Sequence, residues 1–292
     1  MRNTGILIFF VLFLAACSNN NDKSDAYGNF EADETIISAE ANGKIMELNI
    51  EEGTKLDSGE YIGYIDTTQL HLKKRQILSQ KKTLETKFSS IFAQIEVLKE
   101  QKDVAAKNLA RIKKMHEDGA ATSQQLDEVK GKVNVLEKQI EQVKTQNSTV
   151  MNEMKSIETQ IDQIQDMIDN SILINPVKGT VLTKYAEPHE LTGQGKPLYK
   201  IADLDNIILR AYFSGAQLPD IRIDQNVKVL IDKNAEEDQS YEGKIIWIAS
   251  EAEFTPKMIQ TKEERVTQVY AVKILVKNDG KIKIGMPGEV VL

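Results

Sequence analysis

Histidine is the side chain best suited to acid–base or metal chemistry here, and the three histidines are poorly placed for either. His71 and His116 lie near opposite ends of one predicted helix, and His189 follows in a β-patterned segment. The sequence has no HExxH, CxxC or GxSxG motif and no phosphate loop, which argues against the common catalytic sites built on such motifs. The net charge of −7, without an uninterrupted Lys/Arg block, argues against nucleic acid. We therefore expect no enzyme, cofactor or metal site.

Cys17, the only cysteine, lies in a context suited to lipid attachment. An apolar stretch at 6–14 is too short to span a bilayer, and the Leu-Ala-Ala-Cys run that ends it resembles a bacterial lipobox. We expect residues 1–17 to form a lipoprotein signal peptide with Cys17 lipidated. An ordinary secretory peptide with a chance cysteine is the alternative. Residues 18–35 would then be a tether and lead-in, with the mature protein membrane-anchored outside the cytoplasm.

A third group of residues could do recognition chemistry. Arg111, Met115 and Thr122 follow an R-x3-M-x6-T spacing beside a predicted chain reversal. An arginine there can donate to carbonyls or a carboxylate of a partner, a methionine can fill an irregular apolar gap, and a hydroxyl can cap a helix. The alternative is an ordinary helical arginine with capping residues.

Heptads position these three residues at the end of a long arm. Residues 67–171 contain no proline and carry apolar residues at seven-residue spacing, which predicts two antiparallel helices at about 68–117 and 123–170 with a tip near 117–123. Each helix would be roughly 75 Å long. Asn147 takes one core position, where it either specifies register or is solvated at a splayed seam. The core series of the first helix is Leu70, Ile77, Leu84, Ile91, Leu98, Ala105 and Ile112.

Two similar β-patterned segments, 36–66 and 172–203, flank this arm. Corresponding glycines are sixteen positions apart in both, at Gly43 and Gly59 and at Gly179 and Gly195. Such a repeated offset indicates two equivalent β units packed on each other. The arm must then leave and return at one domain.

The remaining residues, 204–292, carry five or six short strand patterns. Strands of this length and number can close a small barrel. The predicted fold class is therefore multidomain α+β: a split β domain, a long coiled-coil hairpin inserted in it, and a β-barrel domain.

This arrangement resembles the HlyD-type membrane fusion proteins, also called periplasmic adaptors, in which a biotinyl/lipoyl-like domain is split by a helical hairpin and followed by a barrel. Their hairpin tip bears an Arg-Leu-Ser triad at R-x3-L-x6-S spacing. Arg111 matches it by identity, while Met115 and Thr122 are chemically close replacements. The stretch from Phe254 to Tyr270 is similar to the subgroup that serves ABC-type exporters.

The resemblance implies a periplasmic adaptor of a tripartite efflux or secretion system. It would link an inner-membrane transporter, ABC type favoured over RND, to a TolC-like outer-membrane channel. It would form a homo-oligomer, a hexamer by resemblance, held at the inner membrane by its lipid. Ser18 departs from the Asp that favours inner-membrane retention in some bacteria, so outer-membrane anchoring stays open. The transported substrate is not predicted.

Two alternatives from other classes remain. A structural coiled-coil envelope lipoprotein would account for the hairpin but not for the split β repeat. A biotinyl- or lipoyl-carrying enzyme subunit would account for the repeat. In such carriers, however, the two halves meet in a tight turn with a modified lysine, and here the hairpin occupies that place.

Overall fold

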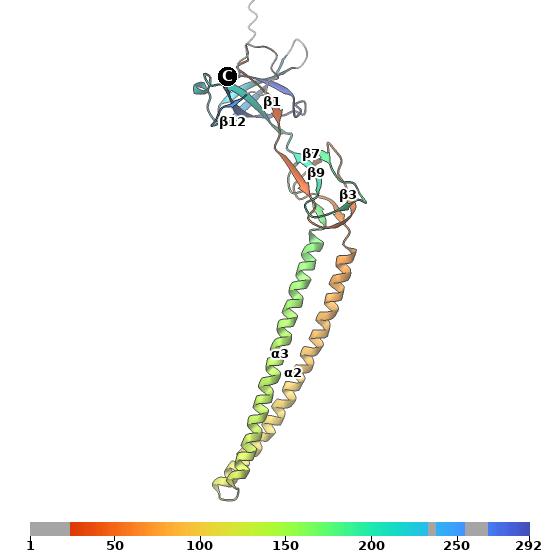
Figure 1. Ribbon diagram of the computed structural model, residues 1–292, viewed down its shortest axis with the longest axis vertical. Coiled ribbons are helices and arrows are strands. Elements are labelled where there is room, and N and C mark those ends of the chain that lie inside the picture. The colour runs from red at the N-terminus through yellow and green to blue at the C-terminus, as the bar shows by residue number, and fades with distance from the viewer. Residues whose placement is uncertain (1–23, 233–237, 255–267) are drawn as a thin grey trace, which may run out of the picture.

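The molecule is elongated, with a β-barrel at one end, a smaller β domain next to it and a long helical hairpin beyond (Figure 1). The computed structural model describes residues 24–232, 238–254 and 268–292. Both ends of the described chain lie in the barrel, where Asp25 N–H donates to the Val290 carbonyl at 2.8 Å. The chain therefore runs from the barrel to the hairpin tip and back.

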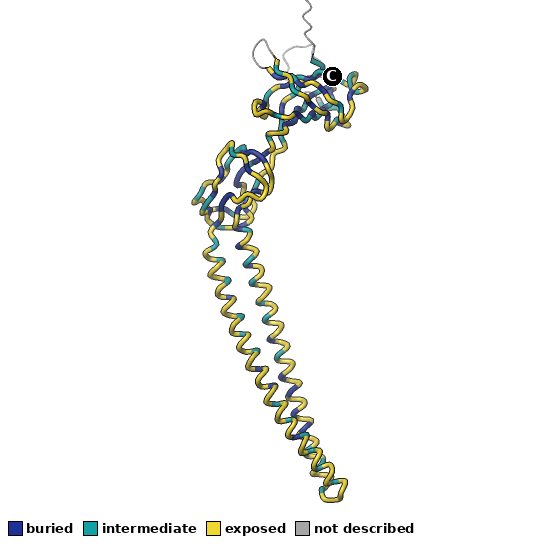
Figure 2. Tube along the Cα trace, turned by 180° about the vertical axis from the view of Figure 1, so that it is seen from behind, coloured by how far each residue is buried: buried dark blue, intermediate teal, exposed yellow. Residues whose placement is uncertain are grey.

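The predicted hairpin of two long helices is confirmed. Helix α2 spans Thr68–Glu117 and helix α3 spans Ser123–Asp169. Figure 2 shows that most of the hairpin surface is exposed and that buried positions recur along each helix. They form three apolar clusters, around Ile77 with Ile164 and Ile168, around Ile91 and Ile95 with Val143 and Val150, and around Ala105 with Val133 and Leu136. All of these residues occupy heptad positions, so the periodicity identified the seam correctly.

Hydrogen bonds hold both ends of the hairpin at its base. The Asp66 carboxylate accepts from the N–H and the hydroxyl of Thr68, at 2.9 and 2.6 Å. Both groups donate to the ionised carboxylate and therefore lower the pKa of Asp66, and the hydroxyl has the larger effect. The Ile65 N–H donates to the Ser171 carbonyl at 2.8 Å. The residues that precede α2 and follow α3 are thus joined directly.

Two four-stranded sheets form the split β domain, and each takes strands from both sides of the hairpin. One sheet has the order β2 (Glu34–Ser38), β9 (Pro197–Ala202), β7 (Gly179–Lys184), β4 (Lys55–Leu56). The other has the order β6 (Ile172–Ile174), β5 (Tyr61–Ile65), β3 (Gly43–Leu48), β8 (Leu191–Thr192). The two halves of the repeat contribute equivalent strands to the two sheets: β2 and β6 come first in their orders, β9 and β5 second, β7 and β3 third, and β4 and β8 last. Neither half therefore completes a sheet without the other.

A buried polar group joins the two halves. Asn175 is fully buried, and its side-chain amide donates to the carbonyls of Asp57 and Val177 at 2.8 and 2.6 Å. Its Oδ1 accepts from the Tyr199 hydroxyl at 2.9 Å. Burial, with a smaller contribution from the Glu60 carboxylate, raises the pKa of Tyr199 to about 12. The tyrosine is thus held as the neutral donor.

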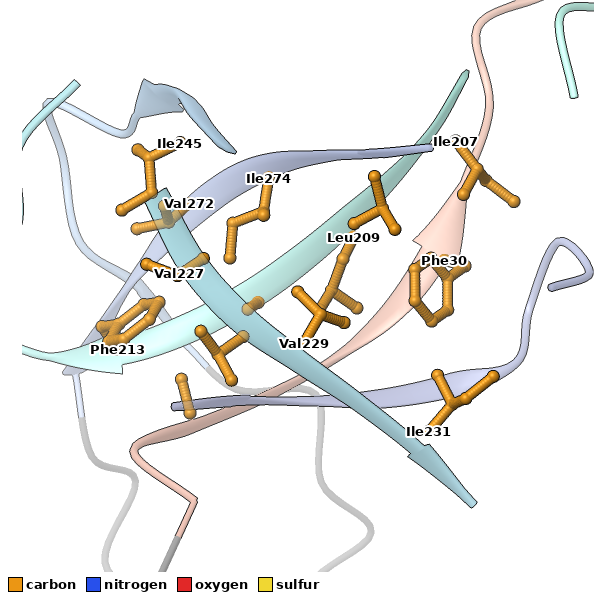
Figure 3. Packing of buried hydrophobic residues seen from close by; sticks show 14 of the residues in the cluster. Phe30, Ile207, Leu209, Phe213, Val227, Val229, Ile231, Ile245, Val272 and Ile274 are labelled. Atoms are coloured by element: carbon orange, nitrogen blue, oxygen red, sulfur yellow. The ribbon is translucent and has the colours of Figure 1, made fainter. Parts of the chain in front are cut away.

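Six strands close the barrel in the order β10, β1, β15, β11, β12, β14, with β14 pairing back to β10. Their core is apolar, with Phe30, Leu209 and Phe213 among its largest side chains (Figure 3). A short strand, β13 (Glu253–Phe254), pairs with the start of β14. The barrel strands are β1 (Ala26–Glu31), β10 (Asn206–Ser214), β11 (Asn226–Asp232), β12 (Asp238–Ile248), β14 (Gln268–Lys277) and β15 (Pro287–Val291).

Strand β1 corrects the prediction for residues 18–35 and 204–292. The barrel is not confined to 204–292, because β1 lies between β10 and β15 and comes from the segment expected to be tether and lead-in. Phe30 enters the barrel core, and at Gly28 an added Cβ would lie 2.0 Å from the Arg210 carbonyl oxygen. Only Ala26 and Phe30 of this strand are buried apolar residues, too few to give a clear alternating pattern.

Candidate docking site at the hairpin tip

The end of α2 is closed by a glycine turn. Gly119 has φ of +77°, its N–H donates to the His116 carbonyl at 3.0 Å, and the Ala120 N–H donates to the Met115 carbonyl at 2.7 Å. This pair of bonds is the Schellman arrangement, which satisfies carbonyls that the helix leaves open. A Cβ on Gly119 would meet nothing within 4 Å. The glycine is needed for its backbone conformation, not for space.

The start of α3 is closed by a capping box. Thr122 is the N-cap, and its hydroxyl accepts from the Gln125 N–H at 3.3 Å. In return the Thr122 N–H donates to Gln125 Oε1 at 2.9 Å. These reciprocal bonds satisfy donors that the first turn would otherwise leave open. The hydroxyl of the predicted docking residue is thus already bonded within its own chain.

His116 adds a bond across the tip that sequence reasoning missed. Its Nδ1 lies 2.8 Å from the Ala121 carbonyl oxygen and donates to it in the Nδ1–H tautomer. The available signal was its place at the end of the first predicted helix, immediately before the chain reversal. Together the three sets of bonds fix the backbone between α2 and α3, so the tip is a closed turn with little freedom.

Arg111 and Met115 present exposed side chains on the last two turns of α2. Met115 is 39% exposed, and Arg111 lies six residues before the end of the helix, roughly 9 Å from it. Within the described part of the chain, the Arg111 guanidinium takes part in no ion pair. The structure therefore brings Arg111, Met115 and Thr122 to one end of the molecule, although no hydrogen bond among the described residues joins their side chains.

Other predicted features lie outside the described residues or have no counterpart within them. Cys17, Ser18 and most of the Phe254–Tyr270 stretch fall outside the described ranges. Over those ranges, no group of three or more His, Cys, Asp or Glu residues is arranged to hold a metal ion. No helix in the described ranges is both long enough and apolar enough to cross a membrane.

The split β domain, the long hairpin and the six-stranded barrel form a fold that this chain shares with a solved membrane fusion protein. Comparison with solved structures confirms the predicted resemblance. The membrane fusion protein Spr0693 from Streptococcus pneumoniae R6 matches with a TM-score of 0.55 and 14% identity, over 91% of this chain and 96% of that one. MacA from Actinobacillus actinomycetemcomitans matches with a TM-score of 0.56 and 21% identity, over 91% and 76%.

Among particular proteins, this chain is similar to a UPF0194 membrane protein of Yersinia pseudotuberculosis serotype O:3 (strain YPIII). The two are 24% identical over 293 aligned residues, which cover 91% of this chain and 89% of the relative. No protein-family model matches the chain. The similarity spans all three parts of the fold, and it is low enough that individual site residues have to be argued from their own geometry.

Proposed function

We propose that this protein is a periplasmic adaptor of a tripartite efflux or secretion system, linking an inner-membrane transporter, ABC type favoured, to a TolC-like outer-membrane channel. The observation that carries the proposal is the closed tip with an exposed Arg111 that forms no ion pair among the described residues, at the opposite end of the molecule from the barrel. A long arm whose rigid end carries an exposed cation is suited to bridging two partners.

Each of the three parts of the fold would have its own role. The barrel would contact the transporter, and the lipoyl-like split domains of several copies, six by resemblance, would form a ring. The hairpins would then extend as a tube toward the outer membrane, with energy supplied by the transporter. The anchor would be a lipid on Cys17 that holds each copy at the inner membrane.

At the tip, Arg111 is the recognition residue. Its exposed guanidinium can form paired hydrogen bonds to helix-end carbonyls or to a carboxylate of the channel. It breaks no ion pair among the described residues in doing so, which keeps the cost of binding low. Met115 would pack into the partner's seam, and Thr122 would act through its cap by holding the tip in shape.

Replacing Arg111 by Asp tests the proposal. We expect R111D to weaken channel binding about 10- to 100-fold, because a charged hydrogen bond contributes roughly 1.5–3 kcal/mol, and to reduce export correspondingly. Lys113→Asp is the matched control, since Lys113 is an exposed cation two residues further along the same helix. Export and cysteine crosslinking to the channel are the measurements. Full export by R111D with normal crosslinking would remove Arg111 from the mechanism.

The anchor is tested separately. Metabolic labelling with a fatty acid should mark the wild-type protein and leave Cys17→Ser unlabelled, and membrane fractionation should assign the labelled protein to the inner membrane. A labelled protein in the outer membrane would contradict inner-membrane anchoring. A biotin or lipoyl adduct in the mass spectrum of the mature protein would contradict the adaptor function itself.

A further inference from the structure

The β-barrel and the split β domain have separate cores and a narrow connection. Among the described residues, none belongs to both apolar clusters, and two short segments, 32–33 and 203–205, carry the chain from one domain to the other. Figure 1 shows the two domains as separate bodies joined by these segments. Domains without a shared core can move relative to each other, so their angle depends on the connecting segments and on side chains that reach across.

The two sides of the connection differ in length. Residues 32–33 lie opposite the longer stretch 203–207, which has no partner on β1 or β2. The extra length folds into a turn, in which the Asp203 carboxylate accepts from the Asp205 N–H and from the Asn206 side-chain amide, each at 2.9 Å. A connection that is short on one side and looped on the other can bend about its short side.

The turn is attached to the barrel through Asn278. The Asn278 N–H donates to the Asp205 carbonyl at 2.9 Å, and the Asn278 side-chain amide donates to the Leu204 carbonyl, also at 2.9 Å. The side-chain oxygen of Asn278 accepts from the N–H groups of Gly280 and Ile282 in its own loop. Asp205 is therefore fixed to the barrel and moves with it.

One ion pair links this turn to the split domain. Lys55 Nζ, at the start of β4, lies 2.6 Å from Asp205 Oδ1. Among the described residues, no other side-chain hydrogen bond or ion pair joins the split domain to the turn or to the barrel. Both side chains are exposed, and an exposed pair contributes little to folding. A small free energy is nevertheless enough to select one angle between domains that share no core.

A second lysine lies near the same carboxylate. Lys178 comes just before β7, which pairs with β4, and together with Lys55 and Asp205 it lines a cavity of about 270 Å³. Its ammonium is 3.8 Å from Asp57 Oδ1, a long distance for an ion pair. Lys55 lowers the pKa of Asp205 through its hydrogen bond and its charge, and Lys178 adds a smaller effect of the same sign. Asp205 thus has one cation in contact and a second one across the cavity.

We propose that Lys55, Lys178 and Asp205 form a latch that sets the angle between the barrel and the split domain. The bond from Lys55 to Asp205 holds the observed angle, and Asp205 transfers to Lys178 when the domains bend. The hairpin lies beyond this hinge and is roughly 75 Å long, so a bend of about 10° moves its tip by at least about 13 Å. The latch is a property of the single chain, so its failure would leave the proposed function standing.

Distances between two labels test the latch in the full-length protein. Spin labels on unnatural amino acids at the exposed positions Lys73 of α2 and Lys228 of β11 report the distance between hairpin and barrel by pulsed electron paramagnetic resonance. We expect Lys55→Gln to change the ratio of two distances about 1.5- to 5-fold, the range that an exposed ion pair supplies. Lys44→Gln is the control, because Lys44 is an exposed lysine of β3 outside the cavity, and it should leave the ratio unchanged.

Further variants separate the two positions of the latch. Adding Lys178→Gln to Lys55→Gln should replace the second distance by a broad distribution. Exchanging the charges, with Lys55→Asp and Asp205→Lys together, should restore the wild-type distance as the major one. High salt should shift the wild type toward the Lys55→Gln distribution, because it screens exposed charges. An unchanged distribution in Lys55→Gln, or no recovery after the exchange, would overturn the latch. A second distance that persists without Lys178 would overturn the transfer.

Discussion

At the residue scale, Asn175 shows how a single buried side chain can join two distant parts of a sequence. It follows the hairpin, yet its amide bonds Asp57, which precedes the hairpin, and its carbonyl accepts from Tyr199. Side-chain and backbone groups here are satisfied mutually in a site that excludes water. Removing one partner leaves the other buried and unpaired, which costs more than the bond itself contributes.

Tyr199→Phe should therefore destabilise the split domain by about 1–3 kcal/mol, because Asn175 Oδ1 loses its donor. Chemical denaturation would measure the change. Tyr64→Phe is the control, since Tyr64 lies on the outer face of the same domain and is 38% exposed. Its removal should alter stability by less than about 0.5 kcal/mol. Equal effects of the two substitutions would show that the buried bond contributes nothing.

The same tyrosine gives a prediction at alkaline pH. Its folded pKa of about 12 lies above the ordinary value of 10, so the neutral form is favoured by folding. Its contribution to stability is complete below pH 10 and is lost as pH rises from about 10 to 12. Unfolding measured over this range should decline less steeply for Tyr199→Phe than for the wild type. Parallel declines would contradict the assignment.

Residue-scale prediction succeeded where the spacing was local. The cap at Thr122 follows from a short-range rule, because a hydroxyl beside a chain reversal is a typical N-cap. Asn175 could not be found in this way, because its partners Asp57 and Tyr199 are distant in the sequence.

At the element scale, the hairpin seam contains a buried polar residue. Asn147 lies on α3 between Val143 and Val150, two buried residues of the central apolar cluster, and its buried Oδ1 has no hydrogen-bond partner among the described residues. Of the two hypotheses for Asn147, solvation at a splayed seam is the less consistent with a buried Oδ1. A polar residue at a core position specifies register at some cost in stability.

Asn147→Val should raise the stability of the hairpin by about 1 kcal/mol, because an unpaired buried carbonyl is replaced by an apolar group. Asparagine and valine have similar helix propensities, so the change reports on the seam. Asn134→Val, at an exposed position of the same helix, should stay within about 0.5 kcal/mol of the wild type. Thermal unfolding followed by helical circular dichroism is the measurement. A destabilised Asn147→Val would show that the amide has a stabilising role.

At the scale of the whole molecule, strand β1 makes the barrel depend on residues that precede the split domain. A protein that begins at residue 34 lacks β1, so β10 and β15 both lose their antiparallel neighbour and Phe30 leaves the core. We expect the barrel of this shortened protein to unfold while the hairpin remains helical. Trp247, the only tryptophan, lies on β12 and reports on the barrel.

Tryptophan fluorescence during urea titration would measure this loss, and a protein that begins at residue 24 is the control because it retains β1. An unchanged urea midpoint for the shorter protein would contradict the structural role of β1. The error in the prediction for residues 18–35 arises because β1 depends on its pairing with β10 and β15, which are distant in the sequence. A single strand with only two buried apolar residues is recognised by its neighbours in space, which a linear pattern does not reveal.

The path of the chain also decides how the molecule transmits force. The chain enters from the barrel, reaches the tip and returns, and its two described ends are hydrogen-bonded to each other within the barrel. A pull on the tip is therefore shared by two covalent strands through the hairpin and the split domain. Cutting one helix of the hairpin would leave the other still joining the tip to the barrel. Tension applied at the tip thus reaches the barrel along two parallel stretches of backbone, and neither stretch has to carry it alone.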